Sequence, residues 1–186
     1  MSAIPVFEIG VWNVWIFMLI NFLPLPIFMR VHKGLLEDTM KIYGEANKAV
    51  YYIEWIFWLL AFVYSIFLPL SVGTMWFYVG LPIALIGTLA YITVIVSFVI
   101  TPLGNDPVTT GLYRYSRHPM YITQLVMFIG AGIASASWLF LLLTIVYGGL
   151  GLIYAGSEER ICLEKYGDAY REYMNRTPRW IGIPRP

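Results

Sequence analysis

The chain has 186 residues, of which 59% are hydrophobic and only 12% are charged, and its mean hydropathy is +0.70. A soluble domain of this size needs more polar residues to cover its surface, so the composition excludes an ordinary water-soluble protein. The net charge is only +1, and we expect no nucleic-acid partner. The single cysteine, Cys162, excludes an intramolecular disulfide.

Five apolar segments follow one another along the chain and predict membrane-spanning helices, since about 20 apolar residues cross the hydrocarbon core. They lie at 11–29, 50–70, 75–100, 119–135 and 138–155. The first contains Pro24 and Pro26 and the third contains Pro82, so we expect a kink or local unwinding at these prolines. Only Ala136 and Ser137 separate the last two segments, which predicts a tight antiparallel hairpin.

Lysine and arginine occur in three stretches that five spans would place on one side of the membrane. Four lie in 30–49, two in 101–118 and six after residue 156, which is all twelve in the chain. The excess of positive charge marks the cytoplasmic side. We therefore expect an integral membrane protein with its N-terminus outside and its C-terminus in the cytoplasm.

The C-terminal tail predicts further helix beyond the last span. The fifth helix should continue to about Tyr166 and stop at Gly167, with Asp168 as the N-cap of a short last helix at 169–174. The expected fold is all-α: a polytopic membrane protein of about five transmembrane helices with a cytoplasmic helical tail, forming one domain over 1–186.

The first polar cluster, 111–121, lies where the chain enters the fourth span. Ser116 can cap that helix, which would place Arg117, His118 and Pro119 in its first turn. A helix N-terminus beside Arg117 and His118 suits a bound anion. The other interpretation is an interfacial belt, because Arg, His and Tyr often anchor a helix at headgroup level.

The second polar cluster, 157–173, leaves the fifth span and begins with Glu158 and Glu159. By itself it is typical of a solvated helix. The predicted hairpin, however, brings the start of the fourth helix beside the end of the fifth. Carboxylates, a histidine, arginines and tyrosines would then surround one cytoplasmic mouth, which is the usual form of a ligand site.

The ordered set of these residues resembles a known family. The segment Gly111-x-Tyr113-Arg114-x-x-Arg117-His118-Pro119-Met120-Tyr121, then Glu158-Glu159 and Tyr166-Gly167-x-x-Tyr170-x-x-Tyr173, is similar to the isoprenylcysteine carboxyl methyltransferase and phospholipid methyltransferase family. The ending Thr177-Pro-Arg179-Trp-Ile-Gly-Ile-Pro184 is similar too. The resemblance covers roughly residues 104–186. It implies a cofactor-binding part at 101–186 and a variable three-helix part at 1–100.

The resemblance implies S-adenosyl-L-methionine as the cofactor. Its carboxylate would suit Arg117 or His118, its ribose diol a glutamate, and its sulfonium a tyrosine face. Methyl transfer needs mainly in-line placement, so no metal is expected. The cofactor-binding residues predicted in this way are Tyr113, Arg117, His118, Pro119, Tyr121, Glu158, Glu159 and Tyr170.

The lipid bilayer is one expected partner, and a lipophilic or prenylated acceptor is another. Our first expectation is the carboxylate of an isoprenylated cysteine, which needs a cation, so Arg117 and above all Arg179 are the candidate catalytic residues. The alternatives are a phospholipid amine or thiol methyltransferase, an NADPH-dependent reductase of the sterol type and a non-catalytic membrane scaffold. The oligomeric state is not predicted.

Overall fold

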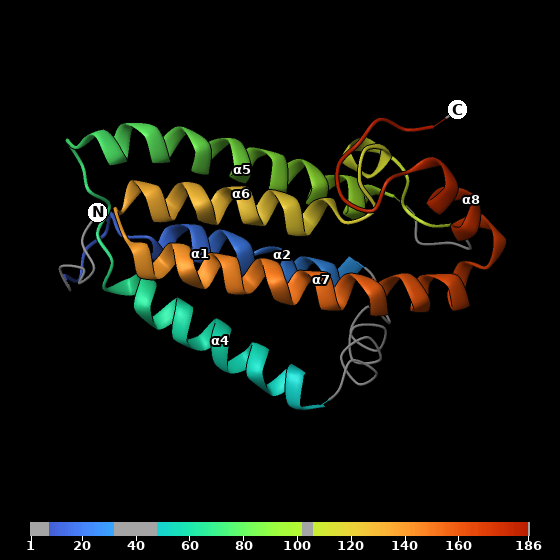
Figure 1. The fold of residues 1–186 in the computed structure, drawn as a ribbon, viewed down its shortest axis with the longest axis horizontal. Helices are drawn as coiled ribbons and strands as arrows, with labels where there is room; N and C mark the ends of the chain where they lie inside the picture. Colours follow the sequence, from blue (N-terminus) through green and yellow to red (C-terminus); the bar gives the residue numbers. More distant parts are fainter. Residues whose placement is uncertain (1–7, 32–47, 102–105, 186) are drawn as a thin grey trace.

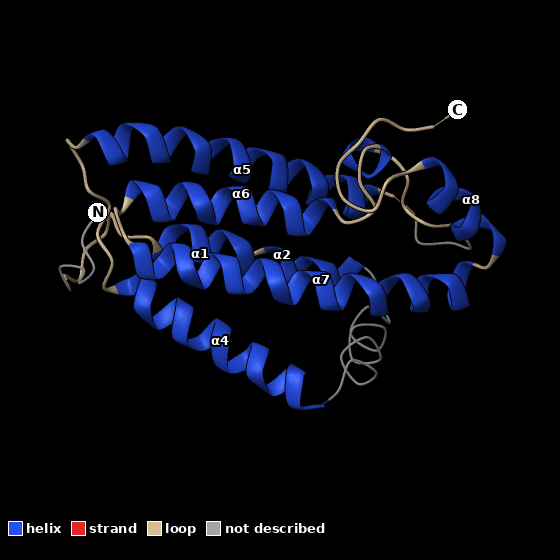
Figure 2. Cartoon of the chain, in the orientation of Figure 1, coloured by secondary structure: helices blue, strands red, loops and turns tan. Residues whose placement is uncertain are grey.

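The structure is a computed structural model, and it describes residues 8–31, 48–101 and 106–185. Within these ranges the regular elements are helices, and most of them run lengthwise along the molecule (Figures 1 and 2). The expected all-α class is confirmed. The elements are α1 (Trp15–Phe22), α2 (Pro24–Val31), α4 (Lys48–Ile66), α5 (Met75–Ile100), η1 (Gly111–Arg114), α6 (Pro119–Ala134), α7 (Trp138–Tyr166) and α8 (Asp168–Arg176).

Proline acts differently in the first and third apolar segments. The first segment is divided into α1 and α2 at Leu23, directly before Pro24, as expected. By contrast, α5 is unbroken through Pro82. The proline removes one hydrogen bond of the helix. Gly80 and Ala84, on either side of Pro82, pack against the backbone of α6. We expected a kink or local unwinding at Pro82, and unwinding does not occur there.

Helices α5 and α6 pack with their backbones in near contact. A Cβ atom added to Gly87 would lie 2.4 Å from the backbone nitrogen of Met127, and one added to Gly130 would lie 2.1 Å from that of Ala84. Only glycine leaves room for such an approach, and small residues at helix interfaces favour association in membranes. This interface supports the N-terminal end of α6, where the first polar cluster lies.

The predicted hairpin joins α6 and α7. Residues 135–137 form the turn, Ala136 has φ 52°, and the Ser137 hydroxyl accepts a hydrogen bond from the backbone N–H of Phe140 at 3.2 Å. At the other end, Gly167 closes α7 with φ 54°, as predicted. Helix α8 begins one residue earlier than expected. Gly167 occupies the cap position, and Asp168 lies inside the first turn, where it accepts a hydrogen bond from Arg171.

Among the described residues, two helices, α5 and α7, are long and apolar enough to cross a membrane, and Trp55–Ile66 and Pro119–Ala134 are shorter apolar helices. Apolar side chains such as Leu89 and Ile145 are 64% and 69% exposed, which suits contact with lipid. Figure 1 shows the end of α2, η1 and α8 at one end of the bundle and the α4–α5 and α6–α7 connections at the other. Lys33 and Lys41 lie outside the described residues.

Candidate cofactor site

A proline at the start of α6 determines the backbone conformation of the first polar cluster. Ser116 was expected to be the N-cap, but the cap residue is His118 and the helix begins at Pro119. The residue before a proline is disfavoured in helical conformation, and His118 has φ −126° and ψ 54°. The Ser116 hydroxyl still contributes, because it accepts a hydrogen bond from the backbone N–H of His118 at 3.0 Å.

The His118 ring lies between the two glutamates of α7, as the hairpin predicted. Its Nδ1 is 3.0 Å from Oε2 of Glu158, and its Nε2 is 3.2 Å from Oε1 of Glu159. His118 is 4% exposed and Glu159 is 5% exposed, whereas the Glu158 side chain is 34% exposed. The two polar clusters therefore form one site at the end of the bundle that contains η1 and α8.

Two aromatic residues pack against the His118 ring. The ring centroid of Tyr121 lies 5.9 Å away, and that of Trp180 lies 5.6 Å away. We did not identify Trp180 from the sequence. The only signal was its place next to Arg179 in the family-like ending.

Glu159 carries most of the ion pairs in the site. The Arg179 guanidinium donates from Nε to both carboxylate oxygens at 3.0 and 3.1 Å, and its Nη2 also contacts Oε2. Nη1 of Arg117 lies 3.1 Å from Oε1. Glu159 is thus surrounded by Arg117, His118 and Arg179, an arrangement in which a buried carboxylate is compensated by cations.

The C-terminal tail folds back over the loop that precedes α6. The backbone N–H of Arg117 donates to the Pro178 carbonyl at 3.1 Å, and that of Gly182 donates to the Tyr115 carbonyl at 3.1 Å. These long-range hydrogen bonds place Arg179 and Trp180 against the site.

Two of the three predicted tyrosines, Tyr113 and Tyr170, both contact Tyr173. Tyr173 donates from its hydroxyl to the Tyr113 carbonyl at 2.7 Å, and Tyr170 packs edge-on against Tyr173. Burial raises the pKa of Tyr113, Tyr170 and Tyr173 above the ordinary value, so all three hydroxyls are neutral at physiological pH. Tyr113 is buried, and its backbone carbonyl supports Tyr173.

The electrostatics of the site favour a charged His118. Burial lowers the pKa of His118, but the hydrogen bonds and negative charges of Glu158 and Glu159 outweigh it, and the net pKa is above the ordinary value of a histidine. The positive charge is therefore retained at higher pH than in a free side chain.

Arg117 has hydrogen-bonding capacity that the protein does not use. Its side chain is 11% exposed, and Nε and Nη1 have no hydrogen-bond acceptor among the described residues. Nη1 is at ion-pair distance from Glu159, but it is not aligned for a hydrogen bond. An unsatisfied buried guanidinium is costly, so these two N–H groups fit an anionic group of a bound ligand.

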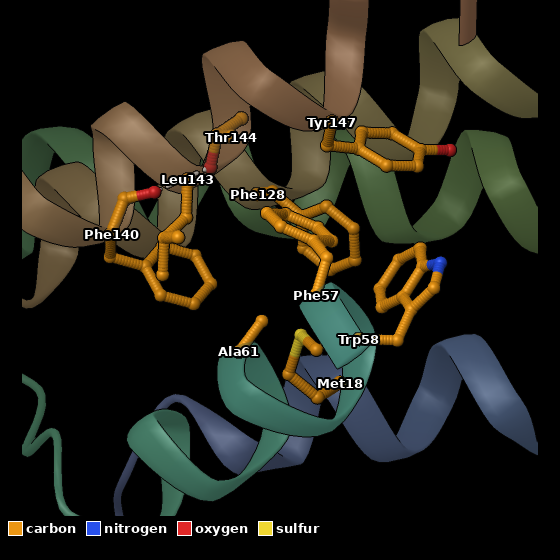
Figure 3. Close-up of a pocket in the computed structure, with 9 residues that line it drawn as sticks. All are labelled: Met18, Phe57, Trp58, Ala61, Phe128, Phe140, Leu143, Thr144 and Tyr147. Carbon is orange, nitrogen blue, oxygen red and sulfur yellow. Dashed lines mark hydrogen bonds between the residues drawn. The ribbon is translucent and has the colours of Figure 1, made fainter. Parts of the chain in front are cut away.

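A small cavity of about 10 Å³ lies elsewhere in the bundle, against Trp58 and Tyr147. Figure 3 shows the side chains around it, with the Tyr147 hydroxyl pointing away from it. This volume suits about one water molecule or one methyl group. Tyr147 is eleven residues before Glu158 on α7, or about 16 Å along the helix. The cavity is therefore separate from the charged site.

The comparisons agree with this geometry. A model of the phospholipid methyltransferase family matches residues 70–169, which is more than half of the chain and includes His118, Glu158 and Glu159. Methanethiol S-methyltransferase 1 of Bradyrhizobium diazoefficiens is 36% identical over 74 residues, which are 39% of this chain and 25% of that relative. The match thus spans a quarter of the relative's length. No solved structure matches the chain. The chain belongs to the phospholipid methyltransferase family, whose members are membrane methyltransferases that use S-adenosyl-L-methionine.

Proposed function

We propose that the protein transfers the methyl group of S-adenosyl-L-methionine to a small thiol dissolved in the membrane, at the site formed by His118, Glu158, Glu159 and Arg117. The observation that carries this proposal is the buried Arg117 guanidinium, whose Nε and Nη1 have no hydrogen-bond acceptor among the described residues. The cofactor presents a carboxylate that would accept from both nitrogens.

The other cofactor contacts follow from the chemistry of the side chains. Glu158 is partly exposed and would accept hydrogen bonds from the ribose hydroxyls. Tyr121 and Trp180 offer aromatic faces beside His118, where a sulfonium would be attracted. The bound cofactor supplies an electrophilic methyl group, and the protein contributes placement and the exclusion of water.

We propose a thiol as the methyl acceptor in place of the carboxylate that we first expected. We expected Arg179 to hold an acceptor carboxylate, but its guanidinium is bound to Glu159. Methanethiol S-methyltransferase 1, to which part of this chain is similar, is named for a thiol acceptor. A thiol needs no such cation at its own atoms: it first gives its proton to water, and its sulfur then forms the bond to the methyl carbon as the sulfonium–methyl bond breaks and S-adenosylhomocysteine leaves. The positive charge of Arg117, His118 and Arg179 would favour the thiolate.

A phospholipid amine is the second candidate, and the name of the matching family favours it. Such an acceptor would keep its acyl chains against the exposed apolar faces of the helices and bring its headgroup to the same site. Unlike a thiol, the protonated amine would be repelled by the arginines of the site.

We also propose the topology that the charges predicted, with five spans and the cofactor site in the cytoplasm. The described arginines and lysines support it, because they lie at the end of α2, the start of α4, the end of α7 and in η1, α8 and the segments beside them. Figure 1 shows these parts of the chain toward the same end of the bundle. Labelling a cysteine introduced at Ser2 in oriented vesicles tests it, and ready labelling from the cytoplasmic side would contradict it.

The decisive experiment supplies methyl-tritiated cofactor to the purified protein in nanodiscs with one acceptor at a time. Ethanethiol, phosphatidylethanolamine and N-acetyl-farnesylcysteine represent the three acceptor classes. We expect label in the thioether product. Label only in the phospholipid or only in the prenylcysteine ester would overturn the thiol acceptor. Binding of NADPH in place of S-adenosylhomocysteine in calorimetric titration would overturn the cofactor assignment.

A further inference from the structure

The hydrogen bonds of His118 define its protonation state. Each ring nitrogen faces one carboxylate oxygen, at 3.0 Å for Glu158 and 3.2 Å for Glu159. An ionised carboxylate accepts hydrogen bonds and donates none, so each nitrogen carries a hydrogen when both glutamates are ionised. Both oxygens of Glu159 also accept from Arg179, which leaves no place for a proton on that group. A neutral imidazole has one N–H and can satisfy only one of the two contacts.

We infer that His118 is an imidazolium paired with both glutamates at neutral pH, and that it positions Glu158 and Glu159 for the cofactor without touching the cofactor itself. Its two ring nitrogens are occupied by the glutamates, Tyr121 and Trp180 pack against the ring, and the residue is 4% exposed. Little of the ring is therefore left to contact a ligand. This inference rests on the proposed function only in placing the cofactor at the glutamates.

The surroundings determine the direction of the pH dependence. The acidic partners of His118 belong to α7. The guanidinium groups of Arg117, in the loop before α6, and of Arg179, in the tail, contact Glu159. The tyrosines of η1 and α8 are neutral. Glu158 and Glu159 contact the ring, and Tyr121 packs on the ring. The other titratable groups of η1, α7 and α8, which interact with the glutamates, with Arg117 or with one another, are Tyr113, Cys162, Tyr170 and Tyr173.

The positioning role of His118 therefore predicts the direction in which cofactor affinity changes with pH. The bridge is complete at low and neutral pH, because the glutamates keep the histidine charged. It loses one hydrogen bond when His118 releases a proton at higher pH. The glutamates then separate, and cofactor affinity falls.

The first test observes the ring directly. The chain has two histidines, so His32→Gln leaves His118 as the only one, and nitrogen-15 NMR of labelled histidine in nanodiscs reports on both ring nitrogens. We expect both to carry hydrogens at pH 7. In Glu158→Gln, which removes one negative charge, the titration midpoint should move to lower pH. A neutral single tautomer at pH 7, or a midpoint that Glu158→Gln leaves unchanged, would overturn the inference.

The second test links the ring to binding. Calorimetry should give a dissociation constant for S-adenosylhomocysteine that rises about tenfold above the NMR midpoint, as expected for one lost hydrogen bond to a charged group. His32→Gln should keep this profile, and Glu158→Gln should shift it together with the NMR midpoint. Affinity that does not change across the midpoint would overturn the positioning role. If no cofactor binds at any pH, the proposed function fails and the protonation result still stands.

Discussion

Arg179 in the C-terminal tail donates hydrogen bonds to both carboxylate oxygens of Glu159 in α7, at 3.0 and 3.1 Å from its Nε. The pair connects the last residues of the chain to the helix that carries the glutamates. It also explains why the tail, which follows the matched family segment, belongs to the site. Arg179 holds Glu159 in place, whereas we had expected it to hold the acceptor.

Arg179→Lys should weaken S-adenosylhomocysteine binding about tenfold. A lysine provides a point charge and cannot reproduce the planar fork that contacts both oxygens. Arg176→Lys is the matched control, because Arg176 forms an exposed i,i+4 ion pair with Glu172 that contributes little. Calorimetric titration measures both variants. Equal affinities in Arg179→Lys and wild type would show that the tail does not order the site.

Glu159→Gln should lower thermal stability more than Glu158→Gln. The Glu159 side chain is 6% exposed and faces three cations, so its loss leaves positive charges close together without compensation. We expect a cost of about 2–4 kcal/mol, discounted because Arg179 is 43% exposed. The Glu158 side chain is 34% exposed, and water replaces much of its effect. Melting temperatures in detergent compare the variants. An equal loss in both would contradict the larger contribution that we assign to the buried Glu159.

Gly87→Ala should separate α5 from α6. The added methyl group would meet the backbone nitrogen of Met127 at 2.4 Å, and a backbone contact cannot be relieved by a rotamer change. Overpacking of this kind costs about 1–3 kcal/mol. Gly149→Ala is the control, since no atom lies within 4 Å of its added Cβ and alanine favours the helix. Thermal melting should show a loss for Gly87→Ala only, and similar melting of both variants would disprove the close packing.

The stability of the protein should fall as the pH rises through the pKa of His118. This pKa is above the ordinary value, because the two glutamates outweigh the effect of burial. A raised pKa in the folded state gives stability that is complete below about pH 6.5, the value of an unfolded histidine, and disappears above the folded pKa. Melting temperatures from pH 6 to 9 should show this decline in wild type and His32→Gln. The decline should be reduced in His118→Gln, and its persistence there would assign it to another group.

Local sequence information was sufficient for the helical class, the hairpin and the meeting of the two polar clusters. Long apolar runs indicate segments that lie in the bilayer. Such segments form helices, because in the bilayer every backbone group must be hydrogen-bonded within the chain. A two-residue connection after residue 135 leaves only an antiparallel return, which brings His118 to Glu158 and Glu159. Gly167 ended α7 as predicted because its positive φ is unfavourable for residues with a Cβ atom.

Tertiary structure decided the partners of the tail and the fine geometry of the site. Arg179 and Trp180 reach the site through long-range backbone hydrogen bonds, such as Arg117 to Pro178, which no periodicity in the sequence encodes. The contact of Gly87 with Met127 depends on the register of two helices, and register is set by packing along their whole length. The sequence by itself determined which residues gather at one end of the bundle. Only the folded chain decided that Arg179 pairs with Glu159, because charge pairing depends on distances that are set by contacts between distant segments.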